Sequence, residues 1–115
     1  NYMAKDPGAE DFAPGFEELD RRKAVVYFHP TAASFAFNVI PNIPPPTIEF
    51  PFDTTRAIVS LMFGGTLHRC PNIKWIFSHG GGVLTAVAER LTLGVRSGRA
   101  RCLAYQRPAG PEEVT

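Results

Sequence analysis

The sequence lacks long hydrophobic runs and carries almost no net charge. Hydrophobic residues make up 44% of its 115 residues, but the longest apolar stretches, 32–37 and 57–63, are each interrupted by a serine. A membrane-spanning helix needs about 18 consecutive apolar residues, so we expect no membrane partner. Twelve basic and 11 acidic residues leave a formal net charge of +1. Because this balance creates no field that attracts polyanions, we expect no nucleic-acid partner either.

Cysteine is also scarce, and the two cysteines form no known pattern. Cys70 and Cys102 lie far apart, with no CxxC sequence and no cysteine paired with histidine at zinc-ligand spacing. This excludes a zinc knuckle and gives no reason to expect a disulfide scaffold. A reducing compartment is the simpler interpretation, and we expect a cytoplasmic protein.

Three common sequence motifs of enzymes are missing. The chain has no GxxxxGK[ST] phosphate-binding loop and no full GxGxxG dinucleotide motif. No GxSxG turn surrounds Ser78, so we do not expect a serine hydrolase. Three glycines, 80–82, stand between a predicted strand and a predicted helix. They could present backbone N–H groups to an anion or simply form a tight turn, and we favour the turn.

The hydrophobic pattern predicts a single α/β unit over residues 1–115. Its two strands are continuous runs of β-branched and aromatic residues, which are typical of strands buried on both faces of a parallel sheet. A helix between them would supply the right-handed crossover that parallel strands require. The predicted elements are a helix at 15–23, a strand at 24–28, an active-site loop at 29–53, a helix at 54–69, a strand at 73–78, a helix at 83–94 and an irregular tail at 95–115.

Prolines dominate the predicted loop 29–53, because they deny the chain backbone donors and helical geometry. The loop is also rich in phenylalanine, and we interpret it as a lid or a pocket wall. Asp53 at its end is predicted to cap the N-terminus of the helix at 54–69. Gly64 and Gly65 would lie inside that helix, where each costs roughly 0.5 to 1 kcal/mol against alanine. We expect close packing against a neighbouring element to offset this cost.

Two histidines directly follow the two predicted strands. His29 follows the first strand and His79 the second. If the strands are parallel, both imidazoles emerge at the carboxyl edge of one sheet, where neighbouring strands are about 4.8 Å apart and where α/β proteins bind ligands. The two imidazole rings could then both contact one bound atom. The alternative is that each histidine is a polar residue that ends a strand and bonds to a loop.

Aromatic and basic residues of the loop and the next helix are candidates for substrate binding. Four phenylalanines could line a pocket for a flat substrate, or could form a small apolar cluster under the loop. They are Phe35, Phe37, Phe50 and Phe52. Arg56 could pair with a carboxylate through two hydrogen bonds, or could be a solvated surface residue.

The stretches VYFHPT (Val26–Thr31) and IEFPFDTTRAIVSLMFGGTLHRCPNIKWIFSHGGGVLTAVAERL (Ile48–Leu91) resemble the amidohydrolase-related metal-dependent decarboxylases. That family includes aminocarboxymuconate semialdehyde decarboxylase and the decarboxylases of hydroxybenzoates, 6-methylsalicylate and γ-resorcylate. The resemblance implies a (β/α)8 barrel with one divalent metal ion, zinc or manganese, at its C-terminal face. It implies that His29 is a metal ligand and that His79 is a catalytic acid/base group beside the metal.

The family's other metal ligands, an HxH pair and a late aspartate, have no counterpart here. A barrel needs about 250 residues, so we expect this chain to be a central segment of about two to three strand-helix units. Its ligand set is incomplete, and we expect it to be inactive alone. The parent would be a carboxy-lyase acting on a small aromatic or enol-type carboxylic acid, and a homo-oligomer, a dimer or tetramer. The alternatives are a metal-dependent hydrolase of the same superfamily and a non-catalytic fragment.

Overall fold

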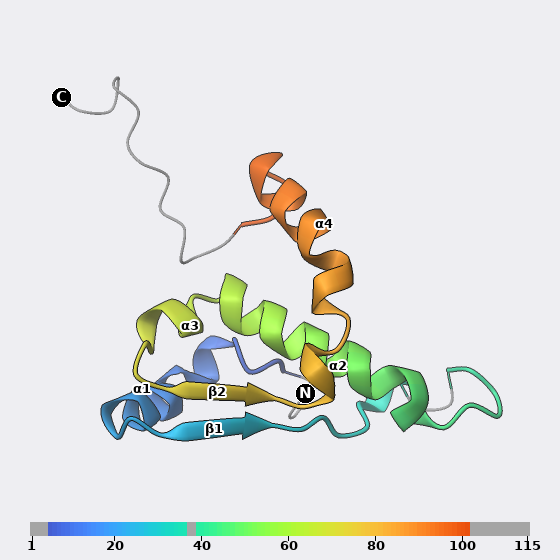
Figure 1. The fold of residues 1–115 in the computed structure, drawn as a ribbon, viewed down its shortest axis with the longest axis horizontal. Helices are drawn as coiled ribbons and strands as arrows, with labels where there is room; N and C mark the ends of the chain where they lie inside the picture. Colours follow the sequence, from blue (N-terminus) through green and yellow to red (C-terminus); the bar gives the residue numbers. More distant parts are fainter. Residues whose placement is uncertain (1–4, 37–38, 102–115) are drawn as a thin grey trace.

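The structure is a computed structural model that describes residues 5–36 and 39–101 (Figure 1). Two parallel strands form the centre, and helices precede, join and follow them. The elements in chain order are η1 (Glu10–Phe12), α1 (Ala13–Arg21), β1 (Val25–Phe28), η2 (Ser34–Ala36), α2 (Pro45–Phe63), α3 (Thr66–Arg69), β2 (Lys74–Phe77), η3 (His79–Gly81) and α4 (Leu84–Arg96).

β1 and β2 pair in parallel, as the sequence predicts. Val25 lies opposite Lys74 and Phe28 opposite Phe77. Beyond the ladder, the Ser78 N–H donates to the Phe28 carbonyl at 3.1 Å. This last bond keeps the two strand ends together, so the residues that follow them leave the sheet side by side.

The two faces of this sheet differ, and the prediction of strands buried on both faces is wrong. On one face, Val25 and Tyr27 are 61% and 59% exposed, and Ile76 is 49% exposed. The other face carries Phe28, Trp75 and Phe77. The apolar runs in the sequence could not distinguish a strand buried on both faces from a strand buried on one face, because both faces carry β-branched or aromatic residues.

An aromatic cluster covers the second face. The Phe28 ring stacks at 6.0 Å on Trp75 and at 5.6 Å on Phe77, measured between ring centroids. Phe16 of α1 packs against Trp75 at 5.4 Å. Such pairs contribute about 0.5–1.5 kcal/mol beyond the area they bury, so this cluster fixes α1 on the sheet. α2 contributes Leu61 to the core, where it is fully buried.

α2 begins at Pro45, nine residues before the predicted helix start at Thr54, so the loop predicted at 29–53 is wrong over its last part. Pro45 and Pro46 occupy the first helical positions, where the missing N–H has no partner to lose. Only Pro51 lies inside the helix and removes a bond. Asp53 is therefore not an N-cap. It lies within α2 and is buried.

The helix predicted at 54–69 is two helices. α2 ends with Gly64 as its C-cap, and Gly65 adopts φ 79° before α3 begins. Residues with a side chain rarely adopt this left-handed conformation. A Cβ on Gly64 would lie 2.6 Å from the Gly8 carbonyl oxygen. Close packing therefore explains the glycine at position 64, and the left-handed turn between α2 and α3 explains the glycine at position 65.

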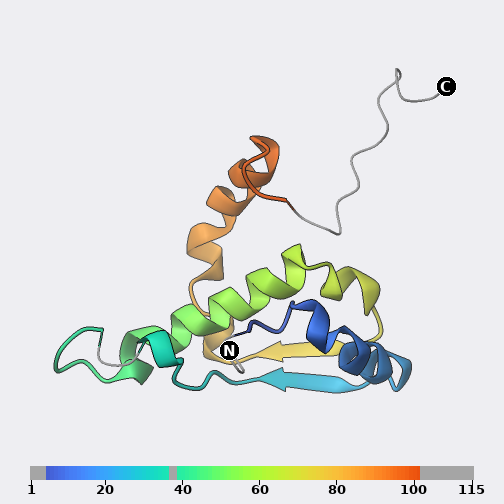
Figure 2. The ribbon, with the colours of Figure 1, turned by 180° about the vertical axis from the view of Figure 1, so that it is seen from behind.

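α4 projects away from the sheet and α2 (Figures 1 and 2). It ends at Arg96, two residues beyond the predicted helix end at 94, and none of its residues, all of which the structure describes, is buried. Part of the predicted tail, residues 102–115, lies outside the described residues. Among the described helices, none combines the length and the hydrophobicity that crossing a membrane requires.

Candidate active site

The two histidines that follow the strands lie together. The ring centroids of His29 and His79 are 5.5 Å apart, with an angle of 55° between the ring planes. Both residues are exposed at the carboxyl edge of the sheet. The parallel register brings them there, since Phe28 and Phe77, the residues that end the two strands, are paired.

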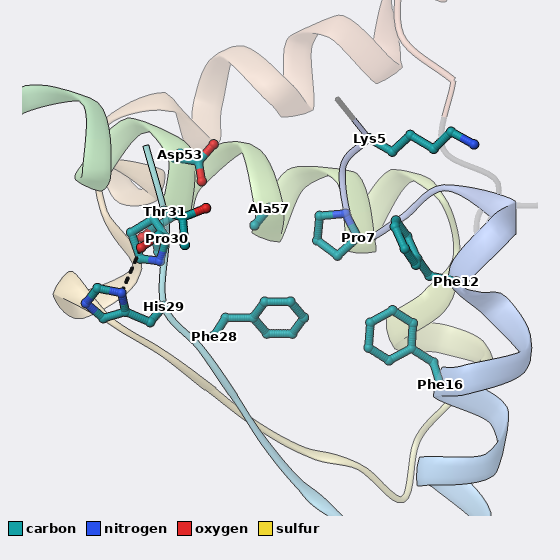
Figure 3. Close-up of a pocket in the computed structure, with 11 residues that line it drawn as sticks. Lys5, Pro7, Phe12, Phe16, Phe28, His29, Pro30, Thr31, Asp53 and Ala57 are labelled. Carbon is teal, nitrogen blue, oxygen red and sulfur yellow. Dashed lines mark hydrogen bonds between the residues drawn. The ribbon is translucent and has the colours of Figure 1, made fainter. Parts of the chain in front are cut away.

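His29 is oriented by the backbone of the next residue. Its Nδ1 lies 2.8 Å from the carbonyl oxygen of Pro30 (Figure 3). A carbonyl oxygen only accepts hydrogen bonds, so Nδ1 must carry the proton and donate it. In the neutral ring, Nε2 then keeps its lone pair. This is the arrangement that proteins use to prepare an imidazole for a metal ion.

His79 sits in a turn of unusual backbone conformation. Its φ is 54°, in the left-handed region that costs most residues roughly 1–2 kcal/mol. The Gly82 N–H donates to the His79 carbonyl at 2.8 Å, and the Gly81 N–H donates to the Ser78 carbonyl at 3.1 Å. All three glycines, 80–82, have positive φ, which supports the turn interpretation of this segment.

This turn is tied to α2 through Thr55. The Thr55 hydroxyl donates to the Pro51 carbonyl at 2.9 Å and accepts the Val83 N–H at 2.8 Å. The loop approaches so closely that a Cβ on Gly82 would lie 2.1 Å from the Pro51 carbonyl oxygen. Glycine at this position thus lets the backbone around His79 rest directly on the helix.

Two residues on one side of α2 face the histidine pair. Phe50 meets the His29 ring edge-on at 5.9 Å and lies 6.3 Å from the His79 ring. One turn later, the Thr54 hydroxyl oxygen lies 3.3 Å from His79 Nδ1. The sequence predicted Phe50 in the site but missed Thr54. A helix beginning at Pro45 puts positions 50 and 54 on one face. The predicted loop included Phe50 and the predicted helix started at Thr54, so the sequence could not predict that these two residues share a face.

The structure does not bring the other predicted substrate-binding residues to the histidines. Phe35 is exposed, and the Arg56 guanidinium lies over its ring at 5.4 Å. Phe52 is 42% exposed. Since successive residues turn by about 100° around a helix, Phe52 and Arg56 project from the side of α2 opposite Phe50. Phe37 lies outside the described residues.

A cavity of about 310 Å³ lies next to His29 (Figure 3). Phe12, Phe16 and Phe28 give it an apolar end, and the other end carries His29 and Asp53. Figure 3 shows these three phenylalanine rings facing a common space, with Asp53 contributed by α2. The cavity thus offers an apolar surface with a polar rim, and the rim includes one of the two histidines.

The described residues fit a metal ion only in part. His29 offers a prepared nitrogen, but no group of three or more histidine, cysteine, aspartate or glutamate side chains gathers within residues 5–36 and 39–101. A catalytic zinc site needs about three protein ligands and an open position. In these ranges, the chain therefore supplies one suitable ligand but not a complete site.

Residues 2–102 match the amidohydrolase family. The chain belongs to this family. A solved structure of an amidohydrolase II superposes with a TM-score of 0.71 at 30% sequence identity, covering 78% of this chain and 30% of the other. This likeness confirms the predicted fold class, α/β with two parallel strands that form part of a (β/α)8 barrel.

Curated relatives of the chain carry the name decarboxylase. Decarboxylase yanB of Aspergillus niger is 47% identical over 88 residues, which cover 72% of this amidohydrolase-family chain and 24% of the relative. The 6-methylsalicylic acid decarboxylase acuB of Aspergillus aculeatus is 36% identical over 90 residues, which cover 78% of this chain and 26% of the relative. The chain thus spans about a quarter of the length of these relatives.

Proposed function

We propose that this chain is the segment of a metal-dependent decarboxylase that supplies one metal ligand and one proton-transfer group. The substrate class is a small aromatic or enol-type carboxylic acid. The observation that carries the proposal is the pairing of His29 and His79, 5.5 Å apart at the carboxyl edge of two parallel strands. The decarboxylase names of the relatives support the same class of reaction.

The two imidazoles take different roles in this proposal. His29 would hold the divalent ion, zinc or manganese, through Nε2, because its Nδ1 is committed to the Pro30 carbonyl. When bound, the ion would supply Lewis-acid stabilisation of the substrate's oxygen atoms. The remaining ligands would come from outside the described residues.

His79 is the acid/base group of the proposed reaction. Decarboxylation breaks the bond between the carboxyl carbon and its neighbour, and the electron pair stays on the neighbouring carbon. In its charged form, His79 gives that carbon the proton that replaces carbon dioxide, and it regains a proton from water between turnovers. Phe50 lies against both rings and would shield this transfer from water.

The experiment measures carbon dioxide release by the protein that carries this sequence, with zinc or manganese added. A panel of hydroxybenzoates, including 6-methylsalicylate, is the first choice of substrates, with the matching methyl esters as controls. We expect the acids to release carbon dioxide and the esters to remain intact. Ester or amide hydrolysis without carbon dioxide release would overturn the proposal and favour a hydrolase on the same scaffold.

The 115-residue chain alone provides a second arm of this experiment. Because the described residues supply one metal ligand of about three, we propose that the isolated chain is inactive. Decarboxylation by the isolated chain would contradict this. Substrate binding by Phe35, Phe52 and Arg56 and the assembly of the parent into a dimer or tetramer stay predictions.

A further inference from the structure

Two consecutive threonines of α2 hold the segment that carries His79. Thr55 holds the backbone of this segment, because the Thr55 hydroxyl accepts a hydrogen bond from the Val83 N–H. Thr54 holds the side chain of His79, because the Thr54 hydroxyl oxygen lies 3.3 Å from His79 Nδ1. Both threonines are more than nine-tenths buried, so neither hydroxyl is placed there as a solvated surface group.

The partners of the two site histidines differ in chemistry. The carbonyl of Pro30 can only accept a bond from His29, so it favours one arrangement of the proton on that ring. The hydroxyl of Thr54 can donate to Nδ1 of His79 when that atom is bare and accept from it when it carries a proton. Both partners leave Nε2 of their ring as the nitrogen that can bind a metal ion or exchange a proton, and they differ only in the proton arrangements at Nδ1 that they allow.

The backbone of His79 does not by itself orient the side chain. Its φ of 54° is set by the glycine turn, and the residue is exposed. Thr54 is the hydrogen-bond partner that the structure gives to the ring of His79. Without it, the imidazole would keep its backbone position and its ring neighbours but lose the hydrogen bond that fixes the direction of Nδ1, since an exposed side chain changes rotamer within nanoseconds.

We propose that Thr54 is a positioning residue, whose hydroxyl keeps the His79 ring oriented for proton transfer at Nε2. This inference rests on the function proposed above, because it assigns Thr54 a role through the acid/base group. It predicts that the loss of the hydroxyl affects turnover more than substrate binding, because Thr54 contacts the proton-transfer group, whereas the metal ion would hold the substrate's oxygen atoms.

The test compares Thr54→Val, which removes the hydroxyl at nearly constant volume, with Thr54→Ser, which restores it. In the protein that carries this sequence, we expect Thr54→Val to lower kcat about 10-fold or more, while KM changes less than about threefold. Thr54→Ser should recover most of kcat. The matched control is Thr66→Val in α3, which makes the same change at another buried threonine and should leave kcat near the wild-type value.

A spectroscopic readout separates this inference from the proposed function. In ¹⁵N-labelled protein without added metal, the ring-nitrogen signals of His79 are assigned with His79→Asn. Thr54→Val should shift the Nδ1 signal of His79 and leave the His29 signals unchanged, and Thr54→Ser should restore the shift. An unchanged Nδ1 signal, or an equal shift in Thr66→Val, would overturn the positioning role. Absence of decarboxylation in the wild-type protein would overturn the proposed function instead.

Discussion

The ends of β1 and β2 are equivalent in the sheet but differ in how they hold a histidine. At the end of β1, the His29 ring bonds to the carbonyl of the adjacent Pro30. At the end of β2, His79 adopts left-handed backbone geometry in a glycine turn, and a side chain from α2 reaches its ring. Matched positions in the sheet therefore do not bring matched surroundings. The His29 ring is held by the backbone that directly follows its own strand, whereas the His79 ring depends on a side chain of α2.

The largest expected effect comes from removing either ring. His29→Asn and His79→Asn should each lower kcat/KM for decarboxylation by about 10² to 10⁴-fold. Asparagine is chosen because it tolerates the positive φ found at position 79, so the turn should survive. Rates of carbon dioxide release by the purified variants measure this. A variant at either position with wild-type activity would break the division of roles between the two strand ends.

The glycine turn is the next target, because only the β2 end depends on it. A Cβ on Gly82 would clash with the Pro51 carbonyl and the Thr55 hydroxyl, whereas Gly80 has open space around it. We expect Gly82→Ala to lower the free energy of unfolding by about 3 kcal/mol, from overpacking and backbone strain together. Gly80→Ala adds strain alone and should cost about 1 kcal/mol. Urea unfolding curves measure both, and equal losses would show that the turn does not rest on α2.

Removal of the backbone anchor should have a smaller effect on stability. Thr55→Val leaves the Val83 N–H without the hydroxyl that accepts its bond, at a cost of about 1–3 kcal/mol. Thr54→Val should cost less than this, because His79 is exposed and water can replace the lost bond. The same unfolding curves compare the two variants. A larger loss in Thr54→Val would mean that this threonine stabilises the fold rather than orienting a ring.

The smallest expected effect concerns the aromatic neighbour that both strand ends share. Phe50→Leu removes the ring that packs against both imidazoles but keeps an apolar side chain. We expect KM to rise about three- to tenfold, equivalent to a contact of about 1 kcal/mol. Phe52→Leu, on the opposite side of α2, should raise KM less. Steady-state kinetics on the two variants test this order, and a larger effect at Phe52 would restore the original prediction for that residue.

The sequence predicted the parallel strands and the meeting of His29 with His79, because both follow from two apolar runs that each end in histidine. It did not predict the start of α2. The prolines at 44–46 look like helix breakers in a sequence, but at the first turn of a helix they lose no hydrogen bond. Because the helix start was wrong, Asp53 was predicted to be a helix cap, although it is a buried residue within α2. For the same reason, Thr54 was not predicted to share a helix face with Phe50.

The exposure of one sheet face could not be predicted from the pattern alone. Val25 and Tyr27 have the residue types of a buried strand, and what covers such a face is a tertiary contact that periodicity does not encode. Likewise, the partners of the two rings, a carbonyl and a hydroxyl, depend on where α2 and the Pro30 backbone lie. The spacing along the chain could predict that the two histidines lie together, but it could not predict the hydrogen-bond partner of either ring.

The most direct test of the central claim is the metal content of the two histidine variants. The protein that carries this sequence would be purified as His29→Asn and as His79→Asn, loaded with zinc, and measured for bound metal after gel filtration. We predict that His29→Asn loses most of the bound zinc, whereas His79→Asn keeps it at the wild-type ratio. Retention of zinc by His29→Asn, or its loss from His79→Asn alone, would contradict the assignment of one histidine to the metal and the other to the proton.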